Sequence, residues 1–177
     1  MEYETSAFVQ DKLKKIGIPY RVIAQTGVAG VIEGKNPGKK IIALGADMDA
    51  LPIQEQNDVP YKSVREGVMH ACGHDVHTTC LLGAAKILQE TSNEWEGTVK
   101  LIFQPGEEKN PGGASLLIKE GVLDNPKPGA IIGQHAMPRI EAGKIGIRSG
   151  KHMASMDAIS IRVVGKGGHG AEPHQNI

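Results

Sequence analysis

The sequence predicts an α/β protein in which helices flank a mixed central β-sheet. Short apolar runs typical of strands alternate along the chain with segments whose apolar residues have helical spacing. The run 98–104 is nearly continuous in apolar residues, which is typical of a central strand covered on both faces. Over 158–164 apolar and polar residues instead alternate, as in a half-exposed antiparallel strand. This change of pattern predicts a main α/β domain over 1–152 and the beginning of a smaller α+β domain over 153–177.

The composition of the 177-residue chain restricts its class. A hydrophobic content of 40% supports a real core, and an aromatic content of 3% requires that core to be aliphatic. Twenty basic and twenty acidic residues give no net charge, so neither nucleic acid nor an anionic membrane is indicated as a partner. The two cysteines, Cys72 and Cys80, do not form a disulfide framework. We therefore expect free thiols and a cytoplasmic protein.

The first third of the chain predicts one helix and three strands. Apolar spacing indicates a helix over 5–16, which a glycine and a nearby proline end. A short strand follows over 20–24. Two β-rich runs, 28–33 and 40–44, are joined by the turn sequence Lys-Asn-Pro-Gly. We expect these two runs to form a hairpin.

The rest of the main domain continues the alternation of helices and strands. The segment 53–69 is polar and has no clear period, so we expect a long loop. A Leu- and Ala-rich helix is predicted over 76–88 and another over 112–121. Further strands are predicted over 130–133 and 143–147.

The densest group of chemically active side chains is the stretch HACGHDVH, residues 70–77. Within eight residues it places one thiol, three imidazoles and one carboxylate, all of which ligate transition metals. A solvated loop or a hydrogen-bonded turn would be the alternatives. Buried imidazoles and carboxylates each need partners, so the density of the stretch favours a metal site.

Polar side chains also follow three predicted strands at the point where each strand ends. They are Asp47 and Asp49, then Glu107 and Glu108, then His135. Each group alone has an ordinary explanation: solvated aspartates, a surface glutamate pair, or a structural histidine. Ligand sites in α/β sheets are built at the carboxyl ends of strands, so together these groups indicate one site. At such a site one glutamate can bind a metal while its neighbour contacts a water on that metal.

The glycine-rich stretch GKGGHGAEPH near the end of the chain resembles a phosphate loop only superficially. It lacks the Gly-Lys-Ser/Thr sequence and the dinucleotide spacing, so we exclude nucleotide binding. Its glycines instead allow the backbone to bend so that His169 projects.

Five stretches resemble, in the same order, those of one enzyme family. They are GADMDALPIQE, MHACGHDVHTT, GTVKLIFQPGEE, GQHAMP and GKGGHGAEPH, and they extend from Gly45 to His174. The family comprises the metal-dependent amidohydrolases related to hippurate hydrolase, plant indole-acetyl-amino-acid hydrolases and bacterial N-acyl-amino-acid deacylases. It is a branch of the aminoacylase and carboxypeptidase metallopeptidase superfamily.

The resemblance implies a zinc-exopeptidase-like catalytic domain followed by the start of a lid and dimerisation domain. It also implies hydrolysis of the amide bond of N-acyl-amino acids or small peptides, which releases a carboxylate and a free amino acid. Two divalent metal ions would serve this reaction, either zinc or manganese, cobalt or nickel. The full-length protein would be a homodimer through the lid domain.

The same resemblance implies a role for each matching position. The metal ligands would be Cys72, His74, Glu108 and His135, with the Cys72 thiolate able to bridge two ions.

Other matching residues would take part in the reaction without binding a metal ion. Glu107 would act as general base and acid, and Asp49 would orient a ligand, with Asp47 as its less defined neighbour. His169 would support the oxyanion from the lid domain, in relatives often from the partner subunit.

Two alternatives to an active hydrolase follow from the sequence. Relatives continue beyond the position of Ile177 and carry a last metal-binding histidine there, so the chain is expected to be a fragment and could be an inactive metal-binding one. A metal-storage or redox module is the other alternative. The presence of Glu107 and Asp49 favours a hydrolase, because storage needs ligands but no general base.

Overall fold

The structure is a computed structural model that describes residues 2–154, 157, 159–172 and 174. It divides into two compact units, residues 1–138 and residues 139–177. All the α-helices and strands that the structure describes lie in the first unit. The domain boundary predicted after residue 152 stays a prediction.

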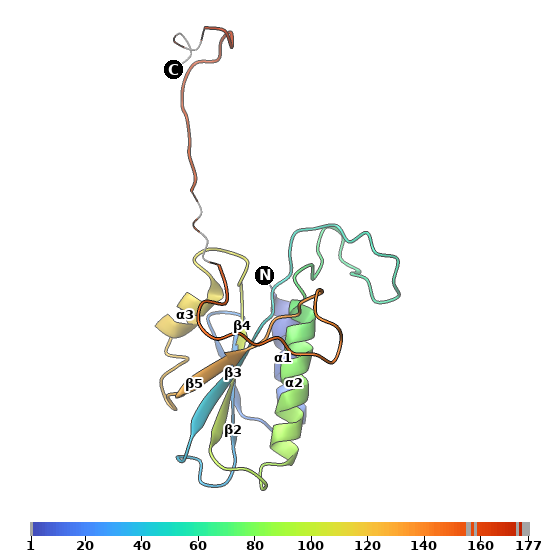
Figure 1. Ribbon diagram of the computed structural model, residues 1–177, viewed down its shortest axis with the longest axis vertical. Coiled ribbons are helices and arrows are strands. Elements are labelled where there is room, and N and C mark those ends of the chain that lie inside the picture. Colours follow the sequence, from blue (N-terminus) through green and yellow to red (C-terminus); the bar gives the residue numbers. More distant parts are fainter. Residues whose placement is uncertain (1, 155–156, 158, 173, 175–177) are drawn as a thin grey trace. The chain divides into compact units, whose positions relative to one another are not determined.

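A five-stranded mixed sheet forms the centre of the first unit (Figure 1). Its strands are β1 (Tyr20–Ile23), β2 (Gly27–Glu33), β3 (Ile41–Asp47), β4 (Thr98–Gln104) and β5 (Ala130–Gly133). The order across the sheet is β1-β2-β4-β3-β5. The β1–β2 and β2–β4 pairs are antiparallel, whereas β3 runs parallel to both β4 and β5. The prediction of a mixed central sheet is confirmed.

The predicted hairpin between the second and third strands is wrong. β4 lies between them and pairs with β2 on one side and with β3 on the other. A turn does follow β2, but there Lys35 forms a bridge to Glu96, just before β4, instead of starting a hairpin. The physical reason is burial: six of the seven residues of β4 are buried, so this strand gains most from the centre of the sheet. The prediction that 98–104 forms a central strand is therefore confirmed.

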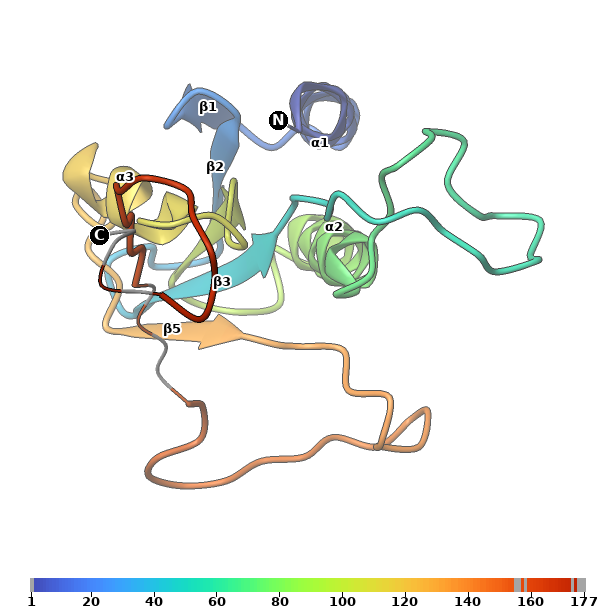
Figure 2. The same cartoon turned by 90° about the horizontal axis from the view of Figure 1, so that it is seen from above.

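Three helices cover the two faces of the sheet. They are α1 (Tyr3–Lys15), α2 (His74–Glu90) and α3 (Gly113–Lys119). Figure 2 shows α1 and α2 on one face and α3 on the other. None of the helices among the described residues combines the length and the apolarity needed to cross a bilayer.

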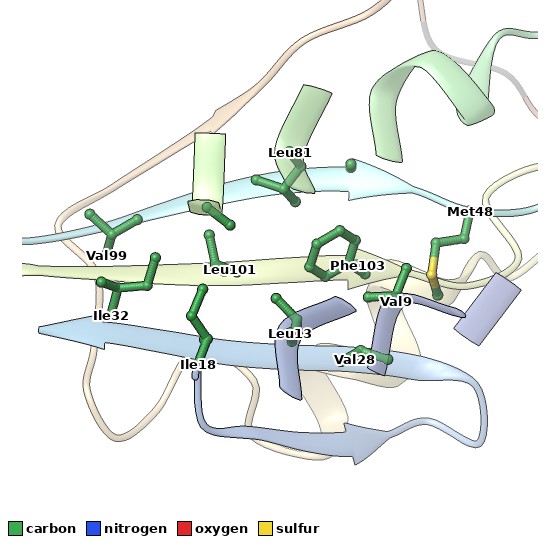
Figure 3. Packing of buried hydrophobic residues seen from close by; sticks show 12 residues of the cluster. Val9, Leu13, Ile18, Val28, Ile32, Met48, Leu81, Val99, Leu101 and Phe103 are labelled. Atoms are coloured by element: carbon green, nitrogen blue, oxygen red, sulfur yellow. The ribbon is translucent and has the colours of Figure 1, made fainter. Parts of the chain in front are cut away.

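The larger hydrophobic cluster lies between the sheet and the helices α1 and α2 (Figure 3). Leu13 from α1 and Leu81 from α2 pack with Leu101 and Phe103 from β4 in this cluster. Leu13, Leu101 and Phe103 are fully buried, which is worth about 1.5–3 kcal/mol for each such side chain. The core is aliphatic apart from Phe103 and the partly buried rings at its border, as the composition predicts.

The opposite face of the sheet holds a smaller cluster under α3. Ile102 from β4 packs there with Leu117 from α3 and with Val122 beyond it. Lys100 points to the same face and is 3% exposed. Its ammonium donates to the carbonyl oxygens of Val122 at 2.8 Å and Asp124 at 3.3 Å. This lysine therefore fastens the turn after α3 to the sheet, and burial lowers its pKa.

Two strands predicted near the end of the chain do not form. The structure assigns no strand to residues 143–147, nor to the described residues 159–164 of the alternating segment. Ala158, the first residue of that segment, lies outside the described residues. A strand needs a neighbour to pair its backbone groups, and the described part of residues 139–177 supplies no such neighbour.

Candidate metal centre

The candidate site lies where three parallel strands end and α2 begins. β3, β4 and β5 run in the same direction, so their carboxyl ends meet at one end of the sheet. Asp47 closes β3, the two glutamates follow the end of β4, and His135 follows β5. His74 is the first residue of α2. The convergence expected from the strand ends is thus present in the structure.

His74 is fully buried and is oriented by a carboxylate. Its Nδ1 lies 3.2 Å from an oxygen of Asp49, which is itself 7% exposed. An ionised carboxylate only accepts, so the proton of the imidazole is on Nδ1 and the lone pair is on Nε2. That Nε2 is buried and has no hydrogen-bond partner among the described residues. A carboxylate behind a histidine whose other nitrogen lacks a partner is the arrangement found at metal ligands.

His135 presents a second imidazole nitrogen to the same site. Its Nδ1 lies 2.7 Å from the carbonyl oxygen of Ala136 and donates to it. The lone pair is therefore on Nε2, which lies 3.4 Å from the sulfur of Cys72. Gly73 has a φ of +84° between Cys72 and His74, a conformation that glycine adopts without strain. It lets the chain place the thiol and the buried imidazole on the same site.

Glu107 and Glu108 approach from the end of β4. An oxygen of Glu108 lies 3.9 Å from Nε2 of His74, and one of Asp47 lies 3.5 Å from the same nitrogen. The backbone N–H of Glu108 donates to the second oxygen of Asp49 at 3.0 Å. Asp49 therefore fixes one histidine and the backbone of one glutamate at once.

The electrostatics of the site show an excess of negative charge. Burial raises the pKa of the Cys72 thiol to about 11, and Glu108 beside it adds to the rise. Burial also raises the pKa of Glu107, with a further contribution from the charge of Glu108. Carboxylates gathered in this way favour a cation among them.

The side chains fit two divalent cations. Ligand atoms of Cys72, His74 and His135 lie within 4.8 Å of one another, and so do those of His74, Glu107 and Glu108. Both groups contain His74, so the two ion positions would be neighbours, and the single free lone pair of this imidazole would bind one of the two ions. A thiol, two imidazoles and carboxylates form a donor set that suits zinc and also accepts other first-row metals.

His77 is a further residue of the site, to which the sequence patterns gave no separate role. This residue is 1% exposed, and its Nδ1 lies 2.5 Å from an oxygen of Asp47. The Thr78 hydroxyl also donates to the carbonyl oxygen of Asp47, at 2.9 Å. The signal in the sequence was the spacing of His74 and His77, which places both on one face of a helix.

His169 belongs to residues 139–177 and is described within that unit alone. The backbone N–H of Ala171 donates to its Nδ1 at 3.2 Å. The ring proton of a neutral His169 is therefore on Nε2, which makes this atom a hydrogen-bond donor.

Comparison with known proteins gives matches over most of the chain. The profile of "Peptidase family M20/M25/M40" matches residues 43–175. The N-acyl-L-amino acid amidohydrolase of Geobacillus stearothermophilus is 45% identical over 177 residues, which cover 99% of this chain and 47% of that protein. The hippurate hydrolase of Campylobacter jejuni is 47% identical over 172 residues, which cover 97% of this chain and 44% of that protein.

A solved structure agrees with these sequence matches. The YXEP protein of Bacillus subtilis, described as a dinuclear metal-binding peptidase of the M20 family, superimposes with a TM-score of 0.79 and 41% identity. The alignment covers 85% of this chain and 42% of that structure. The chain thus spans less than half the length of the relatives it matches.

Proposed function

Since the chain belongs to peptidase family M20/M25/M40, we propose that its site hydrolyses the amide bond of N-acyl-amino acids or small peptides with the help of two divalent metal ions. The products are a carboxylate and a free amino acid. The similarity to an N-acyl-L-amino acid amidohydrolase and to a hippurate hydrolase supports this class of substrate. The observation that carries the proposal is the buried Nε2 of His74, which has no hydrogen-bond partner among the described residues, in a residue grouped with the thiol of Cys72 and with a pair of carboxylates.

Four residues would hold the ions in this proposal: Cys72, His74, Glu108 and His135. Both imidazoles already present Nε2 to the site, because their Nδ1 atoms are engaged by protein oxygens. When bound, the two ions polarise the scissile carbonyl and lower the pKa of a water toward neutrality. Zinc suits the donors, and manganese, cobalt and nickel are the alternatives.

Glu107 is our candidate for the general base and acid. It follows the end of β4 beside the ligand Glu108, within reach of the same space as His74. The raised pKa of Glu107 brings this carboxyl closer to the range in which it can take a proton from water and return it. Glu107 would thus remove a proton from the attacking water and transfer it to the nitrogen of the leaving amine.

Asp49 and His169 complete the proposed machinery. Asp49 would orient the ligand His74 and hold the backbone of Glu108 through its two oxygens. His169 would donate from Nε2 to the oxygen of the scissile carbonyl as negative charge develops on it. His169 lies in residues 153–177, which we propose are the start of a lid domain through which the full-length protein forms a homodimer.

The two free cysteines support a reducing compartment, and we propose that the protein acts in the cytoplasm. Its partner would be a small N-acyl-amino acid or peptide, and we propose neither a nucleic acid nor a membrane as partner.

The test combines metal analysis with hydrolysis of N-acetyl- and N-benzoyl-amino acids. We compare the chain with Glu107→Gln and with the control Glu66→Gln, which makes the same change in the exposed part of the 53–69 loop. We expect two bound metal ions per chain in all three proteins, and metal-dependent hydrolysis that only Glu107→Gln abolishes.

Other outcomes distinguish the alternatives. Bound metal without hydrolysis in the unsubstituted chain would identify an inactive metal-binding part of an amidohydrolase. Full hydrolysis by Glu107→Gln would contradict the role of the base. Absence of bound metal would overturn the ligand set.

A further inference from the structure

His77 has the residue type of a metal ligand but not the surroundings of one. It is one helical turn from His74, and ligand atoms of Asp47, His74 and His77 lie within 4.8 Å of one another. However, protein groups occupy both of its ring nitrogens. Nδ1 lies 2.5 Å from Asp47, and the backbone N–H of Ala136 donates to Nε2 at 2.7 Å. No lone pair of this imidazole is left for a metal.

The two contacts define the protonation of His77. Nε2 accepts from an N–H, so the lone pair is there and the ring proton is on Nδ1, which donates to the carboxylate of Asp47. His77 is therefore a neutral imidazole that links the end of β3 to the segment after β5. It thereby connects two parts of the site, Asp47 and Ala136, that are far apart in the sequence.

Ala136 connects His77 to the proposed metal ligand His135. Its N–H is held by His77, while its carbonyl oxygen accepts from Nδ1 of His135. The rings of His77 and His135 also contact each other, with centroids 4.6 Å apart in an edge-to-face arrangement. A chain of contacts therefore runs from Asp47 through His77 and Ala136 to His135.

The segment that carries His135 needs such a support. β5 is a four-residue strand whose residues are all exposed, and β3 is the one described strand with which it pairs. His135 is exposed as well, and Gly73 packs against the same segment, because a Cβ there would lie 3.1 Å from that of Ala136. Little core packing fixes the direction of the His135 ring.

We propose that His77 is a positioning residue for the metal centre: it binds no metal, and it fixes the ligand His135 by accepting the N–H of Ala136. Its importance for catalysis rests on the proposed function, whereas its contact with Ala136 does not. Outer hydrogen-bond partners of metal ligands typically contribute about 10- to 100-fold to metal affinity.

Two substitutions separate the contacts of His77. In His77→Gln the amide oxygen lies near the position of Nε2 and still accepts the N–H of Ala136. In His77→Asn the amide nitrogen lies near Nδ1 and still donates to Asp47, but nothing accepts from Ala136. His152→Gln is the control, because it changes an exposed histidine within residues 139–177.

The first measurement is Co²⁺ binding, followed through the thiolate-to-cobalt charge-transfer band and the visible ligand-field bands. We expect affinity to fall about 10- to 100-fold in His77→Asn, with altered ligand-field bands. His77→Gln and the control should stay within about threefold of the unsubstituted chain. If cobalt affinity fell in His77→Gln but was retained in His77→Asn, the proposal would be overturned, because the contact of His77 with Asp47 would then be the important one. Unchanged affinity and spectra in both would also overturn it.

The second measurement is hydrogen exchange of the Ala136 amide in the metal-free chain. We expect protection in the unsubstituted chain and in His77→Gln, and its loss in His77→Asn. Equal protection in all variants would overturn the positioning role. If the unsubstituted chain binds no cobalt, the proposed function fails, and this exchange experiment still decides the role of His77. Thermal unfolding of each variant shows whether a loss of affinity reflects global unfolding.

Discussion

Replacing Asp49 with asparagine keeps the size of the side chain but removes one of its two acceptors. The two oxygens of Asp49 face two donors, Nδ1 of His74 at 3.2 Å and the N–H of Glu108 at 3.0 Å. An asparagine has one oxygen, so its amide group must face one of these donors with a nitrogen that also donates. Asp49→Asn therefore breaks one contact in either orientation of the amide.

The magnitude follows from the burial of the site. Asp49 is 7% exposed and His74 is fully buried, so water does not replace the lost acceptor. A hydrogen bond to a charged group in such a place contributes about 1.5–3 kcal/mol. If the amide nitrogen faces His74, the imidazole must move its proton to Nε2 and lose its ligand lone pair. We therefore expect metal affinity to fall about 10- to 100-fold.

Competition with a chromophoric chelator measures this change, with Asp58→Asn as the control for an exposed loop aspartate. Unfolding in urea, measured on the metal-free proteins, shows whether the variant is folded. Affinity within a factor of two of the control, in a folded variant, would refute the reasoning that Asp49 orients His74.

Three further predictions concern the thiol and the supports of the site. In a metal-free variant that lacks Cys80, the rate of alkylation of Cys72 should rise about tenfold per pH unit up to the thiol pKa of about 11, because only the thiolate reacts. A rate that reaches its plateau near pH 9 would contradict the effect of burial on this pKa. Gly113→Ala should cost about 1–3 kcal/mol in urea unfolding and weaken metal binding, because the new Cβ would lie 1.5 Å from the carbonyl oxygen of Pro105, just before the two glutamates; unchanged values for both would exclude this close approach. Lys100→Met should lower the free energy of unfolding by about 1–3 kcal/mol, since the carbonyl oxygen of Val122 loses its donor; equal stability would show that removing a buried charge offsets the lost bonds.

Local patterns predicted the individual helices and strands well within residues 1–138, whereas the strands predicted after residue 138 are not observed among the described residues. The bounds expected for β4 and β5 coincide with the observed strands, because each apolar run is framed by polar or turn residues. The predicted helix over 76–88 was short by two residues at each end, since α2 begins at His74 and ends at Glu90. The meeting of Glu107, Glu108 and His135 followed from the rule that parallel strands present their carboxyl ends together.

Local sequence patterns did not predict which segments pair when they are far apart in the sequence. The insertion of β4 between β2 and β3 depends on how completely β4 is buried, whereas the turn after β2 looks the same in either arrangement. His77 was missed for a similar reason. Its contact with Ala136 joins segments 59 residues apart, and only the fold shows that both ring nitrogens are engaged.

The insertion of β4 also has a consequence for the order in which the chain folds. β2 and β3 are close in sequence, but they do not pair with each other in the sheet. Each of them pairs with β4, which is synthesised about 50 residues after β3. The middle of the sheet therefore closes through non-local contacts, which is slow compared with hairpin or helix formation. Cys72 and His74 leave the ribosome before β4 and before His135, so an early metal ion would meet only some of the proposed ligands. The four proposed ligands of this chain can come together only after β4 has entered the sheet and β5 has joined its edge, so metal binding by all four would follow closure of the sheet.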